Sequence, residues 1–172
     1  MLQIRIHGRG GQGVVTAAEM LSVAAFAQGR HAQAFPSFGS ERTGAPVVAF
    51  CRIDDREIRL REPIMSPDVL INSRRGFEQL GLAEVAARFR HERLTTVPAT
   101  EIALKHLGRP LPNAVLLGGF AALSGLVSLQ AVTHAIHDTF SGKVADGNAA
   151  AAAEAFEYVR REIEELSRAQ AG

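Results

Sequence analysis

The stretch HGRGGQGVVTAAEML, residues 7–21, decides how the first part of this 172-residue chain folds. Its glycines fit the spacing G-x-G-x-x-G, which is informative only where a strand precedes the turn and a helix follows it. Apolar and polar residues alternate over residues 2–7, and an apolar stripe at helical spacing runs through residues 14–27. We therefore predict a strand, a glycine turn and a helix in succession.

The residues of this turn are candidates for binding an anion. Glycine permits positive φ and lets the backbone come close to a phosphate, and the N–H groups at a helix start favour negative charge. The predicted binding residues are Gly8, Arg9, Gly10, Gly11, Gln12 and Gly13.

An NAD site would also need a carboxylate about 20 residues beyond the turn, to hold the ribose hydroxyls. Residues 28–33 read QGRHAQ and contain none, which disfavours NAD. Two interpretations of Arg30 and His31 stay open. They face an additional phosphate, as in NADP or coenzyme A, or they are solvated residues at the end of a helix, where cations are favoured.

The rest of the chain predicts an α/β fold of one domain, residues 1–172, with a mainly parallel Rossmann-like sheet flanked by helices. Residues 35–46, FPSFGSERTGAP, predict a long ordered loop, and a loop of that length is more often functional than idle. A β-hairpin is expected from residues 47–53 and 57–61, and further strands from residues 67–72 and 94–99.

Helices are expected in four further places. Residues 77–89 show helical spacing, and residues 100–108 have Thr100 as a candidate N-cap and Gly108 as a candidate C-cap. Residues 114–137 form an uncharged helical region broken near Gly125. A C-terminal helix, about residues 149–169, has one apolar face and one charged face, so it docks on the domain or on a partner.

The bulk composition excludes several classes of protein. A net charge of +1 argues against a nucleic-acid binder. Residues 114–137 are long enough to span a bilayer but too rich in glycine and polar residues, and no secretion signal precedes the first strand. One cysteine, Cys51, can form no internal disulfide and no iron–sulfur cluster alone. We expect a cytoplasmic chain with Cys51 in its core.

No catalytic set emerges from the remaining motifs. His134 and His137 stand three residues apart on a helix but lack a third ligand, so we interpret them as structural. The sequence SGKV, residues 141–144, lacks the serine or threonine and the upstream glycine of a P-loop. The chain is expected to be a binding platform that holds no metal, rather than a complete enzyme.

Two long blocks together carry a specific resemblance. GRGGQGVVTAAEML followed by FPSFGSERTGAPVVAFCRI resembles the gamma subunit, or the corresponding fused domain, of the 2-oxoacid:ferredoxin (acceptor) oxidoreductases. Residues 97–129 and 140–156 are similar to the same family in the same order. The likeness covers most of the chain.

The resemblance implies a role in a multisubunit complex. Such complexes oxidatively decarboxylate a 2-oxoacid on thiamine diphosphate with Mg²⁺, pass electrons through [4Fe–4S] clusters to ferredoxin or another acceptor, and usually form an acyl-coenzyme A. The cofactors belong to companion alpha, beta and delta (ferredoxin-like) subunits. The gamma part is associated with coenzyme A, so the glycine turn would approach the coenzyme's phosphates. Ser40, Glu41 and Arg42 would face the active-site entrance, with Arg42 as the anion partner.

This chain departs from the family at residues 66–75. There the family continues through another helix and strand before an Asn-Ser step, whereas Ile71 here runs directly into Asn72 and Ser73. We expect the fold to lack about one strand–helix unit. Two alternatives to coenzyme A binding stay open: a free-standing NADP-binding reductase, and a purely structural assembly subunit.

Overall fold

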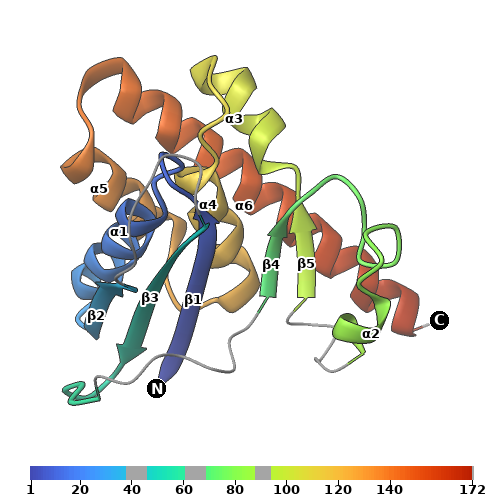
Figure 1. Cartoon of the computed structure of the whole chain (residues 1–172), viewed down its shortest axis with the longest axis horizontal. Coiled ribbons are helices and arrows are strands. Elements are labelled where there is room, and N and C mark those ends of the chain that lie inside the picture. Colours follow the sequence, from blue (N-terminus) through green and yellow to red (C-terminus); the bar gives the residue numbers. More distant parts are fainter. Residues whose placement is uncertain (38–45, 61–68, 88–93, 172) are drawn as a thin grey trace.

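The computed structural model describes residues 1–37, 46–60, 69–87 and 94–171. Its first half is a three-stranded sheet covered on one face by α1 (Figure 1). The strands stand in the order β1-β3-β2, and β3 is antiparallel to both neighbours, so β1 and β2 run in the same direction. The elements are β1 (Leu2–Arg9), α1 (Val14–Ala27), β2 (His31–Pro36) and β3 (Pro46–Asp54).

The second half is a layer of helices around a two-stranded parallel sheet. Helix α4 packs against α6, α5 and α1, and α6 also contacts α3 and α5 (Figure 1). The elements are β4 (Val69–Asn72), α2 (Ala83–Ala86), β5 (Leu94–Val97), α3 (Ala99–Leu107), α4 (Asn113–Ser124), α5 (Leu129–Thr139) and α6 (Gly142–Ala171). Among the described residues, every helix is too short or too polar to cross a lipid bilayer.

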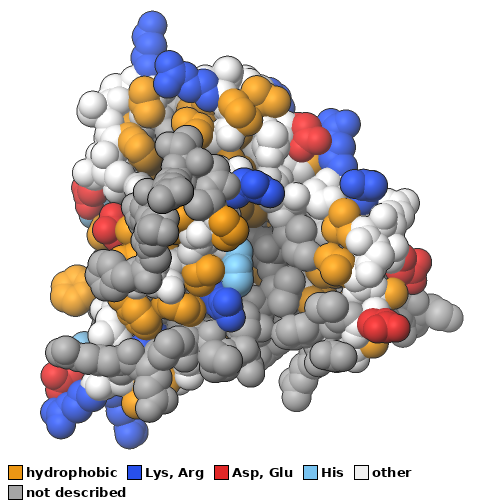
Figure 2. Space-filling model, viewed as in Figure 1, with side chains coloured by type: hydrophobic (Ala, Val, Ile, Leu, Met, Phe, Trp, Pro, Cys, Tyr) orange, Lys and Arg blue, Asp and Glu red, His pale blue; other side chains and the backbone are white. Residues whose placement is uncertain are grey.

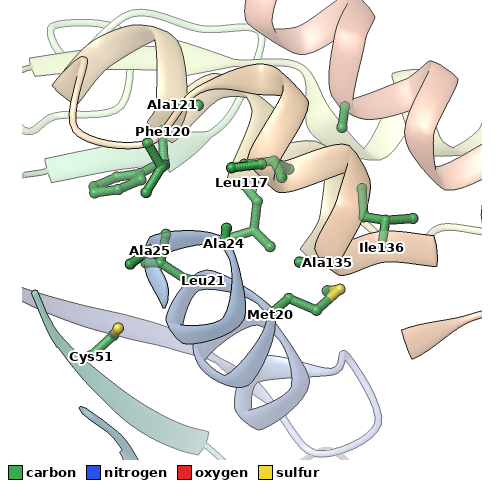
Figure 3. Packing of buried hydrophobic residues seen from close by; sticks show 14 of the residues in the cluster. Met20, Leu21, Ala24, Ala25, Cys51, Leu117, Phe120, Ala121, Ala135 and Ile136 are labelled. Carbon is green, nitrogen blue, oxygen red and sulfur yellow. The ribbon is translucent and has the colours of Figure 1, made fainter. Parts of the chain in front are cut away.

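The main core lies between α1, α4 and α5. Met20 and Leu21 of α1 point toward Leu117 of α4 and Ile136 of α5, and all four are almost fully buried (Figure 3). Cys51 closes the core from β3. A second cluster joins α3, α4, α6 and β5, with Val159 of α6 completely buried. The apolar stripe predicted for α1 is therefore the face that the helix buries.

Small residues allow α4 and α6 to cross closely. A Cβ on Gly118 would overlap the carbonyl oxygen of Ala152 and lie 2.6 Å from its carbonyl carbon. Only glycine fits there, because the obstacle is backbone and cannot move aside. The alanine run of α6 thus supplies a smooth helix surface as well as helix propensity.

Several predictions about the elements are confirmed. The first strand, the α1 helix over residues 14–27, the strands at 69–72 and 94–97, and the helices α3, α4 and α5 are present. Gly108 and Gly125 end α3 and α4 in left-handed conformations, with φ of 64° and 62°. The last helix starts earlier than expected, at Gly142.

The prediction of a mainly parallel sheet is wrong for the described strands. Parallel pairing is confined to β4 and β5, while the larger sheet is antiparallel. The hairpin prediction is wrong for a related reason. Strand β3 is central and its two edges are taken by β1 and β2, so residues 57–60 cannot pair with β3 as a hairpin would, and they form no strand. The class, α/β, is confirmed.

Three smaller expectations also fail. Residues 35 and 36 belong to β2 and Pro46 to β3 instead of the loop, and residues 38–45 lie outside the described residues. The helix expected at 77–89 is reduced to α2, because Gly81 with φ +71° ends the preceding turn. Thr100 does not cap α3; Pro98 precedes the helix, and the Thr100 hydroxyl accepts a hydrogen bond from Asn72 Nδ2 at 2.7 Å.

Candidate functional site

The glycine turn is closed by one side chain. The Arg9 backbone N–H donates to Gln12 Oε1 at 2.7 Å, and the Gln12 N–H donates to the Arg9 carbonyl at 3.0 Å. This reciprocal pair fixes the step from β1 into α1 and explains why glutamine stands between two glycines. Arg9, Gly11 and Gln12 are exposed, so the turn lies at the surface.

The glycines of the turn serve two different purposes. A Cβ on Gly8 would collide with Val14, and a Cβ on Gly13 would lie 2.5 Å from Asn113 Nδ2. Gly8 is therefore explained by packing against Val14, and Gly13 by its φ of +71° together with the Asn113 side chain. Gly11 also has a positive φ, +87°, but a Cβ there would meet nothing within 4 Å. Gly11 is therefore explained by its backbone conformation alone, and it faces open space.

The start of α1 retains the electrostatic character that anions favour. Gly13 is the N-cap residue, with φ of 71°, and no side chain caps the helix. No acidic residue stands in the first turn of α1. The positive end of the helix dipole is therefore unneutralised by this helix's own side chains.

The other residues predicted to bind an anion lie away from the turn or outside the described residues. Ser40, Glu41 and Arg42 lie outside the described residues. The Arg30 guanidinium lies 3.2 Å from Asp55 Oδ1, which favours its interpretation as a structural residue at the helix end. His31 is exposed at the start of β2.

A cavity of about 520 Å³ opens beside the turn. Its floor is α4 and α1, and one wall is β1. Figure 2 shows this face of the molecule hollowed near its centre, with hydrophobic, histidine and basic side chains beside the hollow. The described lining residues are Ile4, Arg5, Ile6, His7, Gly8, Gln12, Val14, Ala17, Leu21, Asn72, Pro112, Asn113, Leu116, Leu117, Phe120 and Leu123.

The cavity is apolar with a basic side. Arg5 and His7 line it, and no acidic residue does among the described lining residues. The Arg5 Nε is buried without a hydrogen-bond partner. Partial burial, and then the positive charge of Arg5, lower the pKa of His7 below its usual value. An anionic group would complement this wall.

Asn72, the last residue of β4, lines the cavity and also contacts α3. Its Oδ1 accepts a hydrogen bond from the Thr100 N–H at 3.1 Å, and its Nδ2 donates to Thr100 Oγ1 at 2.7 Å. The end of β4 is thereby tied to the first turn of α3.

Sequence reasoning missed the cavity residues Arg5, His7, Asn72 and Asn113. Arg5 and His7 alternate with apolar residues and resembled the solvent face of an ordinary strand. Their signal depends on β1 bordering a cavity, which the sequence does not reveal. Cys51 is a core residue, as predicted: it is fully buried, and burial raises its pKa to about 12.

His134 has a local contact within its own helix. His134 Nε2 lies 3.4 Å from Asp138 Oδ2, one helical turn along α5. In the described part of the chain, no three histidine, cysteine or acidic residues cluster as metal ligands would.

The fold and the turn define an α/β domain with a glycine-rich first strand–helix junction. Comparison with known families makes the class specific. Residues 3–87 and 69–158 match the family described as pyruvate ferredoxin/flavodoxin oxidoreductase. The chain belongs to this family, and within it to the gamma-subunit type.

Relatives resemble the chain over nearly its whole length. It is 47% identical to the pyruvate synthase subunit PorC of Methanothermobacter marburgensis, over 93% of this chain and 98% of that one. It is 44% identical to the pyruvate/ketoisovalerate oxidoreductases common subunit gamma of Pyrococcus abyssi, over 91% and 96%. The crystal structure of the pyruvate oxidoreductase subunit PORC of Thermotoga maritima superposes with a TM-score of 0.73 at 31% identity, covering 91% and 95%.

The same comparisons bear on the expected missing unit. Since 93% of 172 residues is about 160, about 14 of the 174 positions compared with the M. marburgensis subunit have no counterpart here. The two family matches overlap at residues 69–87. The expected loss of a strand–helix unit near β4 stays a prediction.

Proposed function

We propose that this chain is the gamma subunit of a multisubunit oxidoreductase that oxidatively decarboxylates a 2-oxoacid to its acyl-coenzyme A and CO₂. The observation that carries the proposal is the 47% identity with a pyruvate synthase subunit over nearly all of both chains. Pyruvate is accordingly the first 2-oxoacid to test. A relative named for ketoisovalerate makes branched 2-oxoacids the second choice.

In this proposal the redox cofactors belong to companion subunits of the alpha, beta and delta type. Those subunits carry thiamine diphosphate, Mg²⁺ and the [4Fe–4S] clusters, and ferredoxin or another acceptor takes the electrons. The chemistry of Cys51 supports the division, because a cluster ligand is a thiolate and burial raises the pKa of this thiol to about 12. A single free thiol also suits a reducing cytoplasm.

We further propose that the chain positions coenzyme A. Three features support this role: the open left-handed backbone at Gly11, the uncapped N-terminus of α1, and the lack of an acidic residue in its first turn. Together they form a surface that favours a phosphate. Arg42, on a loop with Ser40 and Glu41, is proposed as a bidentate partner for the same anion.

A purely structural role in assembly is the second candidate. The packing of Gly8 and Gly13 favours it, because these two glycines are explained without a ligand. The third interpretation, a free-standing NADP-binding reductase, loses support because Arg30 pairs with Asp55. The distal part of α6, where Leu166 is 47% exposed, is the segment we propose for docking against a companion subunit.

The test compares Gly11→Asp with Gly11→Asn in the assembled oxidoreductase. Both side chains tolerate the left-handed backbone better than most, but only aspartate brings a negative charge to the turn. Coenzyme A positioning predicts a KM for coenzyme A at least tenfold higher for the aspartate variant, at similar kcat. Arg42→Ala should raise the same KM, with Arg109→Ala as the control. Equal KM values across all four variants would favour the assembly role.

A further inference from the structure

The cavity borders an edge of β1 and not only one of its faces. Five consecutive residues, Ile4 to Gly8, line it. Successive side chains of a strand point to opposite faces, so five neighbours meet one cavity only when it lies along the strand's edge. The other edge of β1 is fully occupied, because each residue from Leu2 to Arg9 pairs with β3. The edge at the cavity pairs with none of the described strands.

The opposite side of the cavity is the end of β4. Strand β4 pairs only with β5 among the described strands, and Asn72 at its end lines the cavity. Figure 1 shows β4 between β1 and β5, with β1, β4 and β5 pointing the same way. The cavity, lined by β1, by α4 and by Asn72 at the end of β4, therefore lies between the two sheets. From the sequence, the chain is expected to lack a strand–helix unit near residues 66–75, just before and after β4.

The walls of the cavity indicate what would fill it. Leu116, Leu117, Phe120 and Leu123 of α4 supply an apolar floor. Arg5 supplies positive charge with a buried, unpartnered Nε, and the described lining residues include no carboxylate. A small apolar ligand would cover the floor but leave the backbone N–H and C=O groups of the β1 edge without partners. An extended peptide would cover the apolar floor with its side chains and hydrogen-bond the edge of β1 with its backbone.

We propose that an extended segment of a companion subunit inserts between β1 and β4 and completes the sheet. The segment is about five residues long, given a rise of about 3.3 Å per residue along the bordering stretch of β1. It presents apolar side chains to α4 and a carboxylate to Arg5. The proposal rests on the chain's place in a multisubunit oxidoreductase, and it holds whether or not the chain positions coenzyme A.

Hydrogen exchange in the reconstituted oxidoreductase tests this proposal directly. Peptides from β1 should contain amides that exchange at least tenfold more slowly in the complex than in the isolated chain. A benzoylphenylalanine placed at Leu123 should cross-link to an extended segment of one companion subunit. The KM for coenzyme A is measured separately, so failure of the coenzyme role does not obscure this result.

A charge reversal provides the matched control. Arg5→Glu should weaken association with the companion subunits at least tenfold. Arg5→Lys should retain most of the parent chain's affinity for them. Arg109→Glu, at an exposed position outside the cavity, should change that affinity less than twofold. Unfolding curves establish that each variant is folded, and the exchange measurement needs no variant. Three results would overturn the proposal: β1 amides equally protected in the isolated chain, a cross-link within the chain or to a second copy, or Arg5→Glu associating like Arg109→Glu.

Discussion

The crossing of α4 with α6 and the cavity beside β1 use the same helix in opposite ways. At the crossing, Gly118 of α4 lets the backbone of Ala152 approach so closely that no other residue fits. At the cavity, the same helix presents leucines and a phenylalanine to an open space, next to a strand edge and a buried unpartnered Arg5 Nε.

The residues at the crossing stabilise the fold, whereas the residues at the cavity are available to bind another molecule. Everything at the crossing is explained by packing within the chain. An unpaired strand edge and an unpartnered buried donor are unfavourable for an isolated domain. Such features persist where another molecule supplies the missing contacts, so the open region is where function and assembly are expected.

Thiol labelling should give the largest contrast between the packed core and the cavity beside β1. Because burial raises the pKa of Cys51 to about 12, its thiolate fraction at pH 8 is roughly a thousandfold below that of an ordinary thiol. Labelling of the folded chain should be slower by at least that factor. A cysteine replacing exposed His7, in a Cys51→Ala background, should label readily. Comparable rates for the two thiols would remove the distinction between the regions.

Substitution of Gly118 should give the next largest effect. Gly118→Ala forces a Cβ into the Ala152 carbonyl, so we expect a loss of about 3 kcal/mol or more in the free energy of unfolding. Gly76→Ala is the control, because a Cβ there meets nothing within 4 Å and its φ is not positive. Chemical denaturation of both variants measures the effect. A stable Gly118→Ala variant would mean that α4 and α6 can separate.

The ion pair between α3 and α6 at the protein surface should contribute least to the free energy of unfolding. Glu154 Oε2 lies 2.6 Å from Lys105 Nζ and 2.7 Å from His106 Nε2, joining α6 to α3. Hydrogen bonds from Lys105 and His106 lower the pKa of Glu154 below its usual 4.5. Because these side chains are partly solvated, Glu154→Gln should lower stability by less than about 1 kcal/mol at pH 7.

The pH dependence of that effect has a definite sign. The unfolded chain takes up the proton at a higher pH than the folded one, so the contribution is complete above about pH 4.5. It disappears as pH falls through the lowered, folded-state pKa. Urea unfolding of the parent chain and Glu154→Gln should therefore differ at pH 7 and converge in acid, with exposed Glu19→Gln as control. A difference that persists in acid would contradict the ion pair.

Local signals predicted much of this fold. The apolar stripe of α1, the glycines that end α3 and α4, and the burial of Cys51 all follow from spacing and residue type, since each depends on neighbours in sequence. The order of strands depends on long-range pairing. Nothing near residues 46–54 indicates that they pair on both edges, and that pairing removed the expected hairpin and the parallel sheet.

Only part of the candidate site could be predicted from the sequence in this way. The glycine spacing located the turn, but it did not distinguish Gly11, which faces open space, from Gly8 and Gly13, which accommodate Val14 and Asn113. Arg5 and His7 matter because they line a cavity that residues distant in sequence create. Family resemblance, carried by two long blocks, supplied the identification that local chemistry alone did not.

The most direct test of the central claim is purification of the tagged chain from its native host under anoxic conditions. The eluate is assayed for 2-oxoacid-dependent viologen reduction, with and without coenzyme A, over pyruvate, branched 2-oxoacids and 2-oxoglutarate. We predict that activity co-elutes with companion subunits bearing thiamine diphosphate and iron–sulfur clusters. A chain that elutes alone, binds NADP and shows no such activity would contradict its role as a subunit of a 2-oxoacid oxidoreductase.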